Sequence, residues 1–144
     1  MYLRRFASLM VALFAVSVVR AEPVVVDDFE SLEAWTVIPS DGVSASLHAA
    51  DGVDGKALKL DFDFRQGSGF CVVRRAVPRD LPANYRISFF VRGNGLPNNL
   101  EFKLVDPSGE NVWWVNRRAY TLPAEWTRIS DKARHFRFAW GPSG

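Results

Sequence analysis

Apolar and polar residues alternate along most of this chain, and no long stretch spaces its apolar residues as a helix does. In residues 57–64 (ALKLDFDF), most positions alternate between leucine or phenylalanine and lysine or aspartate. The same alternation at 85–92 and 99–105 predicts strands with one buried and one exposed face. Further strands are expected at 24–29, 34–38, 43–48, 69–77, 112–118, 126–130 and 134–139.

Turn-forming residues separate these segments, as in 39–42 (PSDG) and 93–95 (GNG). Short strands broken by such turns are typical of an all-β sandwich or barrel. At the end of the chain, the pattern predicts an aromatic strand with Phe136, Phe138 and Trp140 on one side. Because only a short loop follows this strand, we expect a sandwich that lacks its last strand or strands.

The first 21 residues have the pattern of a secretory signal peptide. Arg4 and Arg5 precede an apolar run over 6–19, and small residues lie near a cleavage position after Ala21. That run is short for a membrane span. We therefore predict a signal peptide at 1–21 and one domain at 22–144, exported to the periplasm or the extracellular space and free of the membrane after cleavage. An uncleaved N-terminal anchor is the alternative.

Net charge changes the picture little. The whole sequence has 18 basic and 16 acidic side chains, but three of the arginines lie in 1–21, and 22–144 has 15 basic and 16 acidic side chains. This balance gives no strong support for nucleic acid or an anionic membrane as a partner. With Cys71 as its single cysteine, an exported chain has no internal disulfide and depends on its core for stability.

The stretch 109–120 (GENVWWVNRRAY) combines aromatic residues with amide and guanidinium groups. Strand alternation places Trp113 and Val115 toward the core. The opposite face then carries the candidate ligand-binding residues Trp114, Asn116, Arg118 and Tyr120. An aromatic ring covers the apolar side of a sugar ring, while amide and guanidinium groups bind neighbouring hydroxyls, so this face predicts a sugar-binding site. The alternative places both tryptophans in the core and leaves the arginine heads in water.

Two other groups of charged residues have chemical potential. Asp27, Asp28 and Glu30 offer oxygen ligands for calcium, although their spacing does not match a calcium loop, and solvated charges at a strand end are the alternative. A basic cluster between Arg117 and Arg137, interleaved with aromatic residues, has the chemistry to bind single-stranded nucleic acid. Expected export favours an anionic polysaccharide over nucleic acid, and a solvated surface is the common outcome for such runs.

Catalysis finds little support in the sequence. His48 and His135 lie in separate predicted strands, neither of them near a serine or cysteine motif. The chain has no nucleophile elbow, no Cys/His metal spacing and no phosphate-binding glycine loop. We therefore expect a protein that is not itself an enzyme.

Several stretches, taken in order, resemble galactose-binding-like β-sandwich domains, in particular the family 11 carbohydrate-binding modules at the front of secreted bacterial glycoside hydrolases. The stretches are DDFE followed by Trp35, then GKALKLDF, YRISFFVRG, NLEFKLVDPSGENVWWV and EWTRIS. The resemblance implies a jelly-roll sandwich, a glycan bound on a concave sheet face and often a structural calcium. It matches Phe70 to an aromatic ligand contact and Asp27, Asp28 and Glu30 to acidic residues of the family's first strand.

The resemblance and the tryptophan strand together predict a non-catalytic carbohydrate-binding module. Its partners would be a polysaccharide or oligosaccharide and a downstream catalytic domain of the same exported, polysaccharide-degrading protein. Two alternatives stay open: a structural or docking β-sandwich without a ligand of its own, and a sugar-active enzyme, such as a lyase, built on a jelly roll.

Overall fold

The computed structural model describes residues 22–65 and 67–144, so the signal peptide predicted at 1–21 lies outside the described residues. Within them the chain forms nine strands and one 3-10 helix, η1 (Ala133–His135). The strands are β1 (Thr36–Pro39), β2 (Val43–Asp51), β3 (Lys56–Phe64), β4 (Cys71–Arg74), β5 (Arg86–Val91), β6 (Asn98–Val105), β7 (Val112–Tyr120), β8 (Thr127–Lys132) and β9 (Arg137–Trp140). Among residues 22–65 and 67–144, the structure has no helix that could span a membrane.

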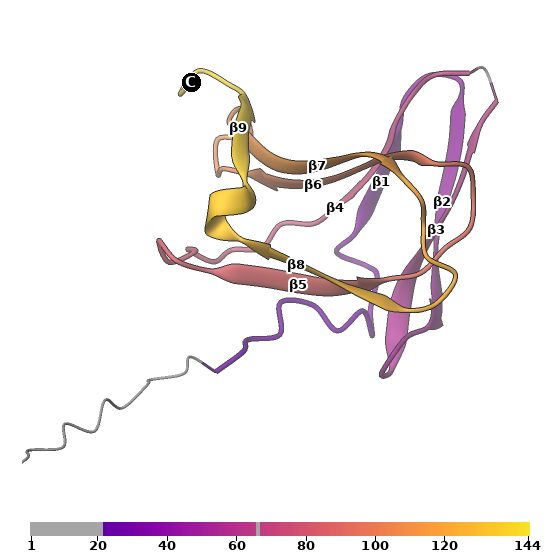
Figure 1. Cartoon of the computed structure of the whole chain (residues 1–144), viewed down its shortest axis with the longest axis horizontal. Coiled ribbons are helices and arrows are strands. Elements are labelled where there is room, and N and C mark those ends of the chain that lie inside the picture. The colour runs from indigo at the N-terminus through magenta and orange to yellow at the C-terminus, as the bar shows by residue number, and fades with distance from the viewer. Residues whose placement is uncertain (1–21, 66) are drawn as a thin grey trace, which may run out of the picture.

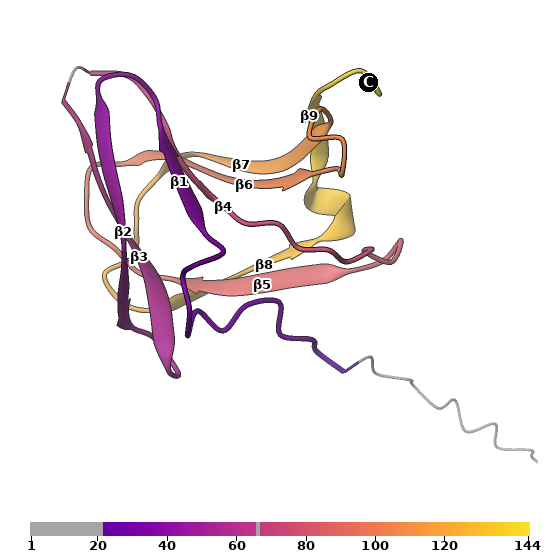
Figure 2. The ribbon, with the colours of Figure 1, turned by 180° about the vertical axis from the view of Figure 1, so that it is seen from behind.

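All strand pairs are antiparallel, in the groups β1–β4, β2–β3, β5–β8 and β6–β7–β9. Figures 1 and 2 show β6 and β7 as one layer above β5 and β8. The β2–β3 hairpin stands across one end of these layers, and the chain crosses from β8 to β9 at the other end (Figure 1). The predicted all-β sandwich is confirmed.

Two predicted strands differ from the structure. Residues 24–29 form no strand, because the Asp27 carboxylate accepts the Phe29 N–H at 2.7 Å and Phe29 adopts a left-handed φ of 60°. The segment 134–139 begins as η1, and only residues 137–140 form β9. A register shift between the β7 and β9 pairs then places Trp140 on the opposite face from Phe138, so the prediction that both share a side is wrong.

The core is a cluster of aromatic rings between the two layers. Phe102 of β6 lies 5.2 Å from Phe89 of β5 and 5.8 Å from Phe136, measured between ring centroids. Such tilted and edge-on contacts are favourable beyond the area they bury. The buried apolar residues in the described part of the chain are Ala57, Val112, Ile129 and Phe136.

A buried ion pair also joins the layers. Arg117 of β7 points inward and donates from Nη2 to both carboxylate oxygens of Asp131 in β8, at 2.7 and 2.8 Å. Asp131 is only 3 % exposed, and loss of its partner would leave a buried carboxylate without compensation. Arg117 is therefore a structural residue between the sheets and does not belong to a basic surface.

Candidate functional site

The two tryptophans of β7 face opposite sides of their sheet, as alternation predicts. Trp113 pairs with Leu104 across β6 and packs edge-on against Phe138, with ring centroids 5.6 Å apart. Its neighbour Val115 pairs with Phe102 of the aromatic core, so the inward direction predicted for Trp113 and Val115 is confirmed. Trp114 consequently lies on the outer face of the β6–β7–β9 sheet.

On that outer face Trp114 and Trp140 form a perpendicular pair. Their ring centroids are 5.6 Å apart and their planes meet at 88°. The Lys103 ammonium lies 5.5 Å from the Trp114 ring and 5.1 Å from the Trp140 ring, which is the range of a cation–π contact. Trp140 remains 48 % exposed, so much of its surface is open to a ligand.

Glu101 connects the polar groups beside these rings. Its carboxylate accepts the Lys103 ammonium at 2.8 Å and the Asn116 Nδ2 at 3.2 Å. Because the charges of Lys103 and Glu101 offset each other, this pair adds no net charge to the surface. We call the surface formed by Glu101, Lys103, Trp114, Asn116 and Trp140 the aromatic face.

Sequence alone did not assign Glu101, Lys103 or Trp140 to the site. Alternation over 99–105 does place Glu101 and Lys103 outward, so the signal was present but unspecific. Trp140 lies on the aromatic face because β9 has one more residue than β7 between two successive pairs of the ladder. No feature of the sequence predicts this bulge.

A bulge at the end of β7 separates the remaining candidates. Pairing jumps from Leu100–Arg117 to Asn98–Tyr120, which leaves Arg118 and Ala119 opposite one residue. Ala119 takes a φ of 49°, and its N–H donates to Asn99 Oδ1 at 3.3 Å. Tyr120 therefore lies on the same side as Arg117, and the prediction that it shares the face of Trp114 is wrong. Arg118 is exposed at the bulge.

Phe70 lies just before β4, apart from these strands. It is 56 % exposed, and it exchanges two 2.9 Å hydrogen bonds with Ser40 after β1. Within the described residues no strand pairing joins β1–β4 to the sheet that carries Trp114. The strand pairings thus place Trp114 and Asn116 together, Arg118 at the bulge and Tyr120 on the opposite face, while Phe70 lies outside these strands. Ligand contact by each of the five stays a prediction.

The loop before β7 is fixed by Asp106. Its carboxylate accepts the Ser108 hydroxyl at 2.6 Å and the Asn111 amide at 2.7 Å. These two bonds, in this order, lower the pKa of Asp106 to about 2. Asn111 is buried, and its Oδ1 accepts the Ser143 N–H at 2.9 Å, so the loop also holds the segment after β9 beside β7. This clamp helps to hold Trp140 against Trp114.

The acidic residues near the N-terminus have protein partners. Asp27, with a side chain 9 % exposed, pairs with the Arg75 guanidinium and accepts the Trp35 indole N–H at 3.0 Å. Glu30 accepts the backbone N–H of Lys56 at 2.9 Å. A guanidinium in contact with a would-be ligand repels a calcium ion, so this arrangement does not fit calcium. Calcium binding by Asp27, Asp28 and Glu30 stays a prediction that the geometry does not support.

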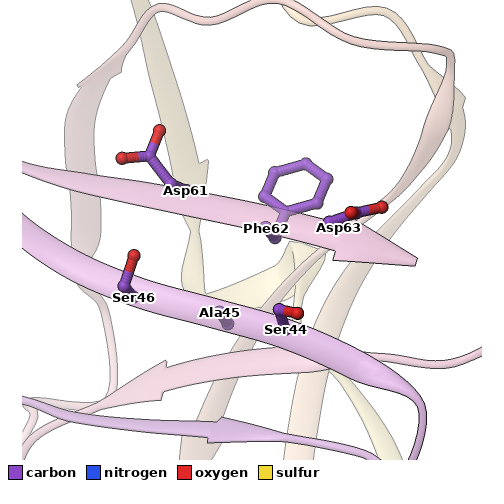
Figure 3. A pocket seen from close by; sticks show the side chains of 6 residues that line it. All are labelled: Ser44, Ala45, Ser46, Asp61, Phe62 and Asp63. Carbon is purple, nitrogen blue, oxygen red and sulfur yellow. The ribbon is translucent and has the colours of Figure 1, made fainter. Parts of the chain in front are cut away.

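A shallow hollow of about 260 Å³ lies on the β2–β3 hairpin. Figure 3 shows Asp61, Phe62 and Asp63 along β3, beside Ser46, Ala45 and Ser44 on β2. Ser46 Oγ and Asp61 Oδ2 both approach Nε2 of His48, at 3.0 and 3.6 Å. A nucleophile–base–acid relay needs the hydroxyl and the carboxylate on different ring nitrogens, so this trio lacks the required geometry.

The fold has known counterparts, although no protein-family model and no curated protein matches this sequence. One similar structure is a family 11 carbohydrate-binding module from Clostridium thermocellum in complex with a beta-1,3-1,4-mixed-linked tetrasaccharide, at 22 % identity and a TM-score of 0.65. The likeness covers 82 % of this chain and 72 % of that one.

A second similar structure is the family 11 module of the cellulosomal cellulase Lic26A-Cel5E of the same organism, at 21 % identity and a TM-score of 0.62. It covers 82 % of this chain and 71 % of that chain. The expected resemblance is confirmed at the level of the fold: this chain has the fold of family 11 carbohydrate-binding modules.

Proposed function

We propose that this protein is a non-catalytic carbohydrate-binding module that binds glycan on the aromatic face. The observation that carries the proposal is the perpendicular Trp114–Trp140 pair, partly exposed beside the charged groups of Lys103 and Glu101. Its fold supports the proposal, since one structure with this fold is complexed with an oligosaccharide.

The geometry suits a neutral sugar chain. Two rings at 88° present surfaces that cover different sides of a sugar residue. Lys103 is held between the rings and Glu101, so its remaining N–H donors are positioned before a ligand arrives. Pairing between Lys103 and Glu101 avoids the cost of leaving either of these two charges without a partner under a bound glycan.

We also propose that the module works within a larger exported protein whose catalytic domain degrades polysaccharide. The signal-peptide pattern of residues 1–21 supports export. One module of the same fold belongs to a cellulase, which supports the link to a degrading enzyme. The identity of the glycan would follow from the chemistry of that catalytic domain.

Calorimetric titration of the full chain with neutral oligosaccharides, including the beta-1,3-1,4-mixed-linked tetrasaccharide, tests the proposal. Trp114→Ala should weaken binding by about 1–3 kcal/mol, the scale of a lost aromatic anchor. Phe62→Ala is the matched control, because Phe62 is an exposed aromatic residue on the β2–β3 hairpin, outside the sheet that carries Trp114, and this variant should bind neutral glycan as the wild type does.

Folding of each variant is checked by circular dichroism. Unchanged affinity in a folded Trp114→Ala chain would contradict the proposal. If the wild type binds no neutral glycan, the result would favour the alternative of a structural or docking domain without a ligand of its own.

A further inference from the structure

The outer face of the β5–β8 sheet carries a row of basic residues. The register pairs Arg86 with Lys132, Ser88 with Ser130, and Phe90 with Arg128. Beyond the last pair, Arg92 lies over the Trp126 ring, with the guanidinium carbon 4.7 Å from its centroid. We call this surface the basic face: it consists of Arg86, Ser88, Phe90, Arg92, Trp126, Arg128, Ser130 and Lys132.

The cations of the basic face lack acidic partners. Among the residues that the structure describes, no ion pair involves Arg86, Arg92, Arg128 or Lys132. The acid of β8, Asp131, points to the other side of the sheet, toward Arg117. Arg128 donates from Nη2 to the Ser88 hydroxyl at 3.1 Å, and its other N–H groups remain available to a ligand. These guanidinium groups are therefore open to an anionic ligand.

The basic face also has an extended shape. From Arg86 to Arg92 it runs about 20 Å, at roughly 3.4 Å per strand residue. A hollow of about 350 Å³ opens at the Arg92 end, lined by Arg92, Gly93, Asn94 and Ala124. Phe90 is 48 % exposed in the middle of the row and flanked by hydroxyl and guanidinium groups.

We propose that the basic face binds an acidic polysaccharide through its carboxylate or sulfate groups. Arginines bind these groups through paired, charge-assisted hydrogen bonds, while Phe90 covers the apolar side of a sugar ring and the serine hydroxyls bind sugar oxygens. This site is separate from the aromatic face and does not rest on neutral-glycan binding there. It also replaces the basic cluster that the sequence predicted, because Arg117 lies inside the molecule and Arg137 pairs with Trp114 on the other sheet.

A polysaccharide fits this face better than other polyanions. Single-stranded nucleic acid is bound on several successive aromatic platforms, but here the Trp126 ring is covered by Arg92 and Phe90 stands alone among polar groups. Binding at a membrane surface buries an apolar stripe beside the cations. This row has no continuous apolar stripe, because the register pairs two serines at its centre.

Binding of the full chain to polygalacturonate and to dextran sulfate, at several salt concentrations, tests the proposal. The first probe carries carboxylates and the second sulfates, so tighter binding to one identifies the preferred anion. Arg86→Gln and Arg128→Gln should each weaken binding to the preferred probe about tenfold, and the double variant should show a shallower dependence on salt. Ser130→Glu, which places a carboxylate at the centre of the row, should also weaken it.

Arg137→Gln is the matched control, because it removes the same charge from an exposed arginine on the other sheet and should leave binding unchanged. The proposal is overturned if Arg137→Gln weakens binding as much as Arg128→Gln, or if Trp114→Ala abolishes it. It is also overturned if the wild type binds neither probe, or binds a single-stranded oligonucleotide or anionic lipid vesicles equally tightly. Loss of neutral-glycan binding in Trp114→Ala, with binding to the acidic probe retained, would support both sites independently.

Discussion

The aromatic face and the basic face are both outer sheet surfaces that combine cations with tryptophan, yet their central charges are arranged differently. On the aromatic face, Lys103 lies between two indole rings and is neutralised by Glu101 at 2.8 Å. On the basic face, Arg92 lies over one indole ring, and the register gives its row no acidic residue. A paired cation is a preorganised hydrogen-bond donor for a neutral ligand, whereas an unpaired row attracts an anion.

The inward pair of Arg117 and Asp131 is a third arrangement of charges, and its role is to stabilise the fold. Asp131→Ala should lower the free energy of unfolding by about 3 kcal/mol, because it leaves a largely buried guanidinium without its partner. Urea unfolding measures this change. If the variant does not fold, Asp131→Asn provides the milder test. Asp61→Asn, at an exposed pair, should change stability by less than about 1 kcal/mol, and equal effects of the two changes would contradict a structural role for Asp131.

The N-terminal pair of Asp27 and Arg75 extends the same test to the acidic residues predicted to bind calcium. Asp27→Ala should lower the free energy of unfolding by about 2 kcal/mol, because the Trp35 indole and the Arg75 guanidinium lose their acceptor. If pairing is the role of Asp27, calcium should leave the melting temperature of the wild type unchanged. A clear rise with calcium, absent in Asp27→Ala, would instead support the predicted metal site.

Glu101→Gln tests directly whether paired charge distinguishes the aromatic face from the basic face. It removes the acid that the register places on the aromatic face and leaves Lys103 unpaired on a face that also carries Arg137, the cross-strand partner of Trp114. Affinity for neutral glycan should fall by about 1 kcal/mol as Lys103 loses its fixed position, and affinity for an acidic polysaccharide should rise. Calorimetry with both kinds of glycan measures the exchange. A variant whose two affinities both stay at the wild-type values would show that Glu101 does not set the charge of this face.

Much of the fold was predictable because its strands obey simple alternation. Residues 57–64 and 85–92, for example, match β3 and β5 closely, since one face of each lies toward the interior and the other toward solvent. The strand predicted at 24–29 was wrong because the Asp27 side chain competes for the local backbone N–H, an effect that hydrophobic pattern does not record.

Strand alternation predicted the site except where the β6–β7 and β7–β9 ladders contain a bulge. Trp114 and Asn116 share a face, as their spacing requires. Tyr120 and Trp140 do not follow the simple pattern, because an extra residue in each ladder reverses the side on which they lie. Alanine occupies the left-handed position of the first bulge, where glycine or asparagine would have been the usual signal. Which cations are paired depends on contacts between strands that are distant in sequence.

The central claim is that glycan binds at the Trp114–Trp140 pair, and the indole N–H signals of the five tryptophans test it most directly by NMR. The full chain, labelled with ¹⁵N, would be titrated with the beta-1,3-1,4-mixed-linked tetrasaccharide and with other neutral oligosaccharides. The account predicts that the signals of Trp114 and Trp140 move while those of Trp35, Trp113 and Trp126 stay in place. Movement confined to Trp126 or Trp35, with Trp114 and Trp140 unchanged, would contradict it.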